Sequence, residues 1–452
     1  MMQQPEGRSL LKAALESKKT TSRRAVSRQA SSTSSSRAVS AQNSKVNSPT
    51  ASRQPSDDEN DDLISEFSTT DSLDGLPDAG ESGSPNTPDD MFDLIERICD
   101  RVRSSQKSRK EDLAVYTNIL RSYYCPYQIE EHSSDLLETF VKCVRQENSE
   151  TEALNALKAI QITIMTDASQ APYDICADPL KTAISSTISR NIKEEALYTL
   201  GIAAFFGGTA ESELEELITT YLFEIIDTDG AHVSADDDPD VVSAALDVLA
   251  LLASRVEDLS QLPHEIMEAI VGQLDSTDVR VQVAAGEAIA LLYEKSYTDI
   301  EDGEKPDIDI TITDPDGHDA TVPNPKMKKR YEPYRGKPQL LETLTALSKV
   351  SAKTMSKADR KTLHTEFVDI AQSVVNPTLG PRYSTAIEQD TNRHYGSRLK
   401  VKLGKRQKTF DKWWMYIRLK AITRAVQGGF KEHAQENEAV YGSLGNELWE
   451  GA

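Results

Sequence analysis

The sequence predicts an all-α fold in which helical hairpins stack into a superhelix. Apolar residues recur with helical periodicity from about residue 89 to residue 297. Within this region a short apolar pattern repeats, beginning at Ala153, Ala196, Ala245 and Ala285, with offsets of 43, 49 and 40 residues. These offsets are close to the ~40 to 47 residues of armadillo and HEAT repeats. A small C-terminal α+β unit and a disordered N-terminal tail complete the expected architecture.

Residues 275–294 give the clearest helix of this array. Ser276 or Thr277 can cap its N-terminus through a hydroxyl that accepts a free backbone N–H. The small residues Ala284, Ala285 and Gly286 allow another helix backbone to come close, as stacked hairpins require. This helix is therefore expected to be covered on most of its surface.

The N-terminal tail, residues 1–88, is basic and then acidic. Residues 1–53 contain ten Lys or Arg and two acids, whereas residues 57–90 contain twelve acids and no Lys or Arg. With few large apolar side chains, this segment cannot offset the entropy cost of ordering and is predicted to be disordered. Its Arg- and Ser-rich start is also compatible with a mitochondrial transit peptide, although Glu6 and Glu16 interrupt the pattern.

Four further segments follow the tail. We expect armadillo-like repeats over 89–300, an insertion with a basic linker over 301–338, further helices over 339–376 and a small domain over 377–452. Residues 307–313 alternate isoleucine with polar residues before a turn at 314–317, which predicts a projecting hairpin. Helices are predicted from Pro338 onward and over 356–375.

The C-terminal domain should combine strands with one helix. Residues 398–403 alternate like a strand with Leu399, Val401 and Leu403 inward, a second strand is expected near 407–410, and a helix over 411–426. Residues 398–424 hold ten basic residues and one acid, a local charge of +9 in a chain of net charge −22.

Several function classes find no support in the sequence. The seven histidines are scattered, and phosphate-loop, dinucleotide-binding and nucleophile-elbow motifs are missing, so no catalytic residue, cofactor or metal site is predicted and we do not expect an enzyme. The acidic loop 227–240 lacks the ligand spacing of an EF-hand. Four dispersed cysteines indicate reduced thiols in an intracellular protein, and no run approaches the ~20 apolar residues of a membrane span.

Two basic stretches with interleaved aromatic residues are the candidate functional sites. Lys and Arg can neutralise phosphates while exposed rings stack on unpaired bases, which is the combination expected of an RNA contact. The candidate RNA-binding residues are Lys328, Lys329, Arg330, Arg335, Lys337, Lys400, Lys402, Lys405, Arg406, Lys408 and Lys412. The rings beside them are Tyr331, Tyr334, Phe410, Trp413, Trp414 and Tyr416, of which Trp413 and Trp414 fit the core of the C-terminal domain better than an RNA contact.

The chain resembles the interferon-related developmental regulators. The helix at 274–294, with LDSTDV followed by AAGEAIALLYE, is similar to the signature helix of that family. Further similar segments are KADRK at 357–361, FVDI at 367–370, LKV at 399–401, Trp413 or Trp414, and the stretch from His433 through Asn437 to 444–445. The family members compared carry a long basic extension after the last helix that this chain lacks, and we hypothesise that the basic linker substitutes for it.

The resemblance implies an armadillo-like fold and a non-enzymatic regulatory role. Members of that family are associated with occupying ribosomes so that translation is silenced, and with transcriptional co-regulation together with chromatin-modifying proteins. The basic stretches favour the first activity, with a ribosome or ribosomal RNA as partner and no membrane or small-molecule substrate. The alternative is a nuclear scaffold whose acidic concave surface holds basic protein partners. The expected location is the cytoplasm, with the nucleus added under the alternative.

Overall fold

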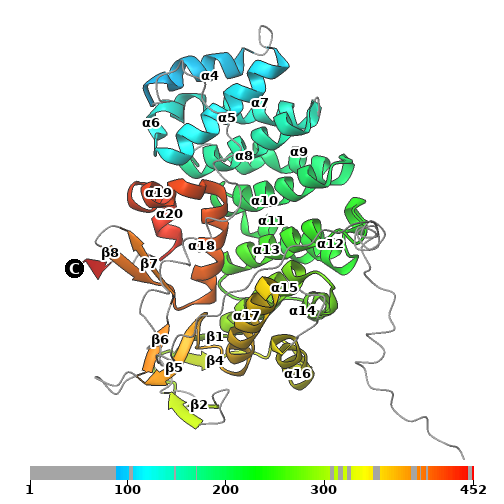
Figure 1. Cartoon of the computed structure of the whole chain (residues 1–452), viewed down its shortest axis with the longest axis vertical. Coiled ribbons are helices and arrows are strands. Elements are labelled where there is room, and N and C mark those ends of the chain that lie inside the picture. Colours follow the sequence, from blue (N-terminus) through cyan, green and yellow to red (C-terminus); the bar gives the residue numbers. More distant parts are fainter. Residues whose placement is uncertain are drawn as a thin grey trace, which may run out of the picture. The chain divides into compact units, whose positions relative to one another are not determined.

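Five helices of 17 residues stand side by side and form what we call the inner row (Figure 1). They are α5 (Gln106–Ser122), α8 (Glu150–Thr166), α10 (Arg190–Phe206), α13 (Pro239–Arg255) and α15 (Val279–Lys295). The computed structural model describes residues 88–100, 105–146, 149–168, 171–305, 310–313, 319–322, 327–349, 357–387, 394–397, 399–403, 406–445 and 450–451. The tail that was predicted to be disordered lies outside these residues, except for Pro88.

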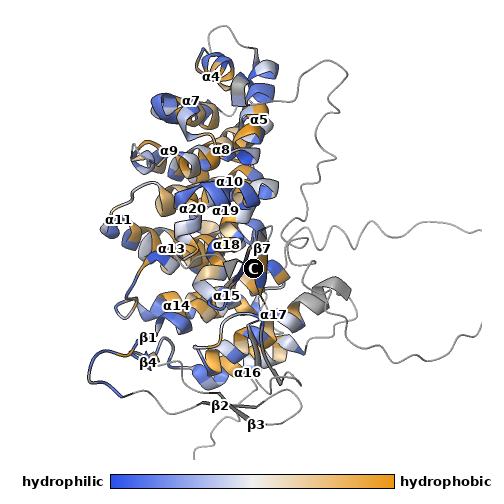
Figure 2. Cartoon of the chain, turned by 90° about the vertical axis from the view of Figure 1, so that its left-hand side faces the viewer, coloured by the Kyte–Doolittle hydropathy of each residue, from blue (hydrophilic) through white to orange (hydrophobic). Residues whose placement is uncertain are grey.

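A second set of helices, the outer row, covers the other side of the stack. It contains α4 (Met91–Cys99), α7 (Ser133–Gln146), α9 (Pro172–Ser186), the run α11 (Glu211–Glu216), η5 (Leu217–Leu222) and α12 (Phe223–Asp227), and α14 (His264–Gly272). An outer helix packs on the inner helix that follows it, and Figure 2 shows α7, α9, α11 and α14 along one edge of the stack. The predicted array of stacked hairpins is confirmed.

Short helical segments join these elements. They are η3 (Pro88–Asp90), α6 (Pro126–Ile129), η4 (Glu130–His132), η6 (Ala231–Val233) and η7 (Gln273–Asp275).

Polar caps start the inner helices where the sequence places an oxygen-bearing side chain. The Ser189 hydroxyl accepts the N–H of Ile192 at 3.4 Å, and Asp238 Oδ1 accepts that of Asp240 at 3.0 Å. The cap predicted at Ser276 or Thr277 is wrong by one or two residues. Asp278 caps α15 by accepting the N–H of Arg280 at 2.9 Å, while Ser276 Oγ accepts the N–H of Asp278 in the turn before the helix.

Small residues let the helices approach closely, as predicted for the 275–294 segment. A Cβ at Gly286 would lie 2.6 Å from Ile370 Cδ1 and 3.1 Å from Phe367 Cε1, both on α17 (Lys357–Val375). Helix α16 (Lys337–Ser348) packs on α17 in turn, so this helix pair continues the stack beyond α15.

Two hairpins project between α15 and α16. Strand β2 (Ile310–Thr313) pairs with β3 (Asp319–Val322) in antiparallel register, which confirms the predicted hairpin, while its predicted turn lies outside the described residues. Strand β1 (Tyr297–Asp299) pairs with β4 (Met327–Lys329). The start of the basic linker is therefore a paired strand, a partner that the sequence did not reveal.

The C-terminal segment forms small sheets and three helices. Its elements are β5 (Tyr383–Ile387), β6 (His394–Ser397), β7 (Lys400–Leu403), β8 (Arg406–Thr409), β9 (Glu450–Gly451), α18 (Trp413–Val426), η8 (Gln427–Gly429), α19 (Phe430–Glu436) and α20 (Glu438–Ser443). β5 pairs with β6, and β8 lies between β7 and β9. Leu399, Val401 and Trp413 are buried, which confirms the predicted inward direction of the first two and the core interpretation of Trp413, while the side chain of Leu403 lies outside the described part.

Candidate functional site

Helix α18 lies across the inner row and contacts α8, α13 and α15 (Figure 1). Its cationic side chains meet carboxylates of the inner helices. We call Glu195 on α10, Asp247 on α13, and Glu287 and Glu294 on α15 the inner carboxylates. Each bonds to α18, although the four lie up to 99 residues apart in the chain.

The internal repeat explains why these carboxylates share one side of the stack. Asp247 and Glu287 each stand two residues after an aligned alanine, Ala245 and Ala285. Equivalent positions of stacked repeats lie above one another, so the two carboxylates face the same helix. One cation can then reach both of them.

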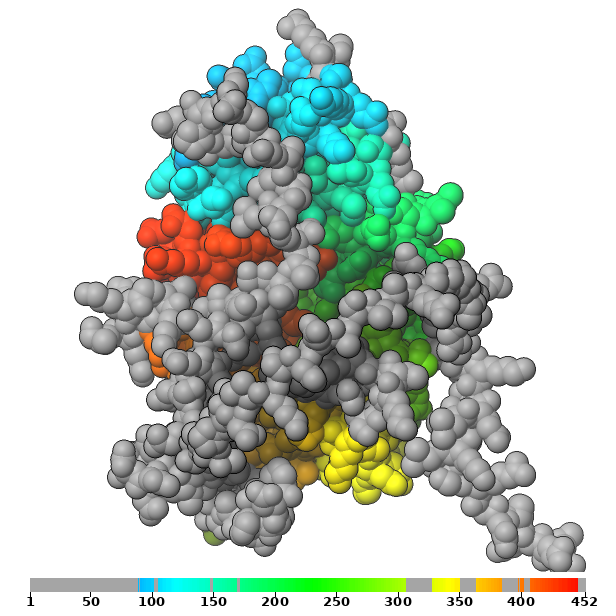
Figure 3. Space-filling model, viewed as in Figure 1, coloured from blue at the N-terminus to red at the C-terminus, as the bar shows by residue number. Residues whose placement is uncertain are grey.

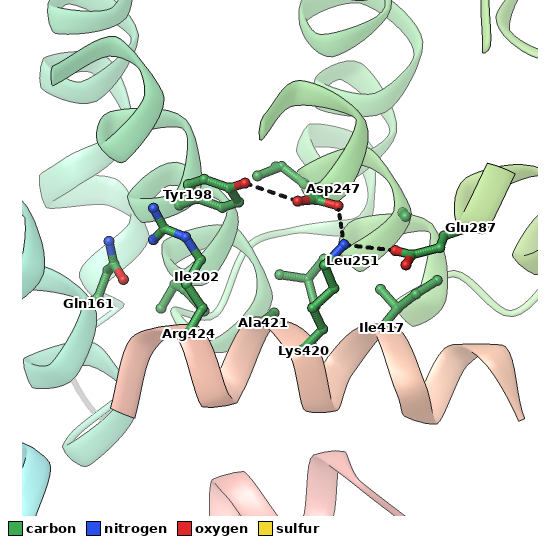
Figure 4. A pocket seen from close by; sticks show the side chains of 12 residues that line it. Gln161, Tyr198, Ile202, Asp247, Leu251, Glu287, Ile417, Lys420, Ala421 and Arg424 are labelled. Atoms are coloured by element: carbon green, nitrogen blue, oxygen red, sulfur yellow. Dashed lines mark hydrogen bonds and ion pairs between the residues drawn. The ribbon is translucent and has the colours of Figure 1, made fainter. Parts of the chain in front are cut away.

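Lys420 is that cation. Its Nζ lies 2.9 Å from Asp247 Oδ1 and 2.8 Å from Glu287 Oε2 (Figure 4). Burial acts to lower the pKa of Lys420, but the two carboxylates outweigh it and hold that pKa well above its usual value. Burial raises the pKa of Glu287, and Lys420 opposes this rise. The single positive charge of Lys420 is shared between Glu287 and Asp247.

Arg424 makes the second ion pair. Its Nη2 donates to Glu195 Oε2 at 2.8 Å, and its guanidinium carbon lies 3.5 Å from the ring centre of Tyr198. Glu195 Oε1 also accepts the side-chain N–H of Gln161 at 2.7 Å. Burial would raise the pKa of Glu195, but Arg424 outweighs it and the net direction is downward.

Glu294 holds the N-terminus of α18. Its Oε2 accepts the backbone N–H of Trp413 at 2.7 Å, and its Oε1 accepts that of Trp414 at 3.1 Å. The N-cap residue of α18 is Lys412, whose side chain makes no capping bond, so α15 supplies the cap from a distant part of the chain. Burial raises the pKa of Glu294 to about 7, although both backbone donors favour its ionised form.

Arg418 adds a bond to the backbone of the inner row. Its Nη2 donates to the carbonyl of Ser254 at 2.7 Å and its Nε to Ser254 Oγ at 2.9 Å. The guanidinium also stacks over Trp414, with its carbon 4.6 Å from the ring centre. The carbonyl belongs to the last turn of α13, where a cation is favourable.

A small cavity remains beneath α18. Its volume is about 40 Å³, and Tyr198, Ile202, Leu251, Ile417 and Arg424 are among the side chains that line it (Figure 4). Since one water needs ~10 to 15 Å³ by this measure, the cavity has room for a few waters and not for a substrate. The interface thus holds α18 against the inner row, and the cavity beneath α18 is too small for a substrate.

The linker residues predicted to bind RNA are mostly engaged with nearby acids. Lys328 Nζ lies 3.3 Å from Glu304 Oε1, and Arg330 donates to both oxygens of Glu304 at 2.9 and 3.0 Å. Lys329 pairs with Glu332. Hydrogen bonds from Arg330, the backbone N–H of Glu301 and Lys328 lower the pKa of Glu304 to about 2. The side chains of Lys328, Lys329 and Arg330 each keep between a quarter and two fifths of their surface exposed.

The other two linker residues differ from each other. Arg335 is exposed. Lys337 is half-buried with its Nζ 5.4 Å from the ring centre of Tyr293, and burial lowers its pKa. Arg335 is therefore the linker cation best placed to meet a partner.

The predicted residues of the C-terminal stretch are partly described. Lys400 is half-buried, and Lys408 is buried and donates to the carbonyl of Gly445 at 2.5 Å. Lys412 Nζ lies 3.7 Å from Met327 Sδ, so the linker and this stretch meet at the start of α18. Lys402 and Arg406 lie in β7 and β8, but their side chains, like all of Lys405, lie outside the described part.

Two expectations about this stretch need correction. Its positive charge is not all available, because Arg418, Lys420 and Arg424 are held by the inner row. The rings of Phe410, Trp413 and Tyr416 are buried, and those of Tyr331, Tyr334 and Trp414 are half-buried. They were candidates for base stacking, but apolar burial places most of these ring faces against protein.

The inner carboxylates were not predicted as a set from the sequence. The available signal was their register with the repeat, since Glu195 directly precedes the aligned Ala196, and Glu152 likewise precedes Ala153. On α8, Glu152 is paired by Arg109 of α5, with Nε and Oε1 3.0 Å apart. Buried acids that recur with the repeat predict cations facing them, and α18 carries most of those cations.

Other kinds of site find no support in the described residues. There, no group of three or more His, Cys, Asp or Glu side chains is placed to hold a metal ion. The four cysteines are free thiols. Among the helices that the structure describes, none has both the length and the apolar character needed to cross a membrane.

Comparison with known proteins places this architecture in a family. An uncharacterized protein of Schizosaccharomyces pombe is 23% identical over 396 residues, which cover 86% of this chain and 82% of that protein. Residues 60–375 match the family described as interferon-related developmental regulator (IFRD). That match includes the inner and outer rows and ends with α17. The chain belongs to the interferon-related developmental regulator family.

Proposed function

We propose that this protein is a non-enzymatic regulator that binds ribosomes or ribosomal RNA and represses translation. The supporting observation is the 3.7 Å approach of Lys412 to Met327, which joins two basic segments 85 residues apart at one end of α18. Arg335 and Lys400 provide accessible or partly accessible charge in these segments. Cations gathered on one surface can each neutralise a phosphate of an RNA backbone.

The large surface of the helical stack is suited to a macromolecular partner. A superhelix of this length presents a large surface, whereas the cavity of about 40 Å³ under α18 excludes a metabolite-sized substrate from that interface. The carboxylates of the inner row are occupied by cations of the same chain. Binding is therefore proposed for the outer surface of the two basic segments that contain Arg335, Lys400 and Lys412, which we call the basic end.

Co-sedimentation of the full chain with purified ribosomes tests the proposal. The Arg335→Glu/Lys400→Glu variant should lower binding at least tenfold near 100 mM salt, and adding Lys402→Glu, Lys405→Glu and Arg406→Glu should abolish it. Wild-type binding should fall steeply as salt rises, because phosphate contacts release counterions. Unchanged sedimentation of the five-residue variant refutes the proposal.

A matched control comes from the outer row. Lys142→Glu/Arg145→Glu makes the same change in net charge as Arg335→Glu/Lys400→Glu, but at exposed positions of α7. This variant should sediment like the wild type. Equal losses in both variants would mean that net charge, and no particular surface, governs binding.

The second candidate is a nuclear scaffold that acts as a transcriptional co-regulator. The inner carboxylates favour it, because they already hold a cationic helix with good geometry. A basic partner at this place would have to displace α18, including its buried Trp413. Binding of the full chain to basic nuclear proteins, with no sedimentation with ribosomes, would favour this candidate.

A further inference from the structure

Exposed tyrosines occur in the segments where the first layers of the stack meet the last helices of the chain. The side chain of Tyr127 in α6 is 84% exposed, that of Tyr123 after α5 is 42% exposed and that of Tyr441 in α20 is 36% exposed. In Figure 3 the cyan surface of the first layers lies directly beside the red surface of the C-terminal helices. Neighbouring aromatic rings left open to solvent are typical of binding surfaces.

Buried hydrogen bonds fix the two sides of this surface to each other. His433 Nε2 donates to the carbonyl of Leu120 at 2.8 Å, and Asn437 Nδ2 donates to the carbonyl of Met165 at 2.7 Å. Both side chains are fully buried or nearly so. The ring of Tyr124 meets the ring of His433 edge-on, with centres 6.0 Å apart. These contacts fix α19 and the start of α20 against the ends of α5 and α8.

Carboxylates occur in the same segments as these rings. The bond from Asn437 to the carbonyl of Met165 brings Glu438 and Asp167, one and two residues further along the chain, to the same place. Burial raises the pKa of Tyr124, and Asp167, Tyr127, Glu438 and Tyr441 add to the rise. Glu438 is exposed at the start of α20. The exposed Glu130 and Glu131 follow Tyr127 within one helical turn.

The closest cation of α5 is turned away from the rings. Arg121 Nε donates to the carbonyl of Ala425 and its Nη1 to Gln427 Oε1, both at 2.9 Å, and so it ties α5 to the end of α18. Lys431 of α19 is exposed as well, but the exposed Glu130, Glu131 and Glu438 outnumber it, so the surface combines aromatic faces with net negative charge. We call Tyr123, Tyr127, Tyr441, Asp167 and Glu438 the tyrosine patch.

We propose that the tyrosine patch docks an arginine-rich, extended segment of a partner protein. A guanidinium can stack on a tyrosine face and at the same time bond a carboxylate through two N–H groups. The carboxylates repel the phosphates of RNA, and a second copy of the chain would bring the same negative patch. This site shares no residue with the basic end and so goes beyond the proposed function.

Fluorescence anisotropy with the full chain provides the test. The probe is a labelled twelve-residue peptide in which six arginines alternate with glycine and serine, at 150 mM salt. Tyr127→Ala/Tyr441→Ala should weaken its binding at least tenfold, and Glu438→Lys should weaken it severalfold. A peptide with lysine for every arginine should bind severalfold more weakly, because an ammonium lacks the planar stacking face.

The control separates the patch from exposed apolar side chains elsewhere on the chain. Phe92→Ala/Ile188→Ala removes two other exposed apolar side chains, 58% and 95% exposed, and should bind the probe like the wild type. Wild-type binding equal to that of Tyr127→Ala/Tyr441→Ala overturns the proposal, as does failure of the wild type to bind. So does a loss, in that variant, of oligouridine binding or of self-association, because the occupant would then be RNA or a second copy.

Discussion

The two halves of the basic C-terminal stretch have opposite surroundings. In the second half, Lys420 and Arg424 are enclosed by the inner carboxylates, with charged atoms 2.8 to 2.9 Å apart. In the first half, Lys400 is half-buried and Lys412 Nζ lies 3.7 Å from the thioether sulfur of Met327. Basic sequence alone does not distinguish a cation that holds the fold together from one that is available to a partner.

The different surroundings of the two halves should give variants with different effects on the free energy of unfolding. A buried ion pair costs desolvation when it forms, but removing one partner leaves an uncompensated charge. Exposed pairs such as Lys329 with Glu332 contribute little, because water screens them and their side chains lose freedom. Variants of α18 should therefore lower the free energy of unfolding, whereas variants of the basic end should leave it nearly unchanged.

Lys420→Met should have the largest effect. Asp247 and Glu287 would face each other without the cation between them, and we expect the free energy of unfolding at pH 7.5 to fall by about 3 kcal/mol. Urea denaturation measures this. Lys142→Met, which breaks an exposed pair on α7, should cost under about 0.5 kcal/mol. Equal effects of the two variants would contradict a stabilising role for the network.

Glu294→Ala should rank second. The change removes the cap from two N–H groups of α18, and we expect a loss of about 2 kcal/mol, at the upper end for caps because this site is buried. Glu294→Gln should cost less, because its amide oxygen still accepts one bond. Hydrogen exchange at the first turn of α18 should accelerate in Glu294→Ala more than in Glu294→Gln, and the reverse order would argue against capping.

Adjacent glutamates on α10 should respond to pH with opposite signs. Burial raises the pKa of Glu194 to about 7, so its ionisation destabilises the fold as pH rises from about 4.5 to 7. Arg424 outweighs burial at Glu195 and lowers its pKa, so that carboxylate stabilises the fold at neutral pH and this contribution is lost as pH falls through the folded-state pKa.

The corresponding variants should differ in sign at pH 8. Glu194→Gln should raise the free energy of unfolding by about 1 kcal/mol, a value reduced for its partial solvent access, and should have no effect at pH 4. Glu195→Gln should lower it by about 2 kcal/mol, with a smaller loss in acid. Urea denaturation at both pH values measures these changes. The same sign for both variants at pH 8 would contradict the assigned roles.

The sequence predicted the stack well because its signal is local. Apolar periodicity, the 40-residue offset from Ala245 to Ala285 and close approach at Gly286 depend on residues of one or two neighbouring helices. The position of α18 depends on the bonds of Lys420 to Glu287 and Asp247, which lie 133 and 173 residues earlier. No short stretch of sequence contains Lys420 together with these acids. The tyrosine patch was missed for the same reason, since Tyr127 and Tyr441 come together only through α19 and α20.

Arg335→Glu should have the smallest effect on stability and a distinct effect on binding. The side chain is exposed, so the free energy of unfolding should change by less than about 0.5 kcal/mol. If Arg335 contacts a phosphate, the slope of log affinity for ribosomes against log salt should decrease by about 1. Lys142→Glu should leave that slope unchanged. A stability loss comparable to that of Lys420→Met would place Arg335 among the cations that hold the fold, and would remove the contrast between the basic end and α18.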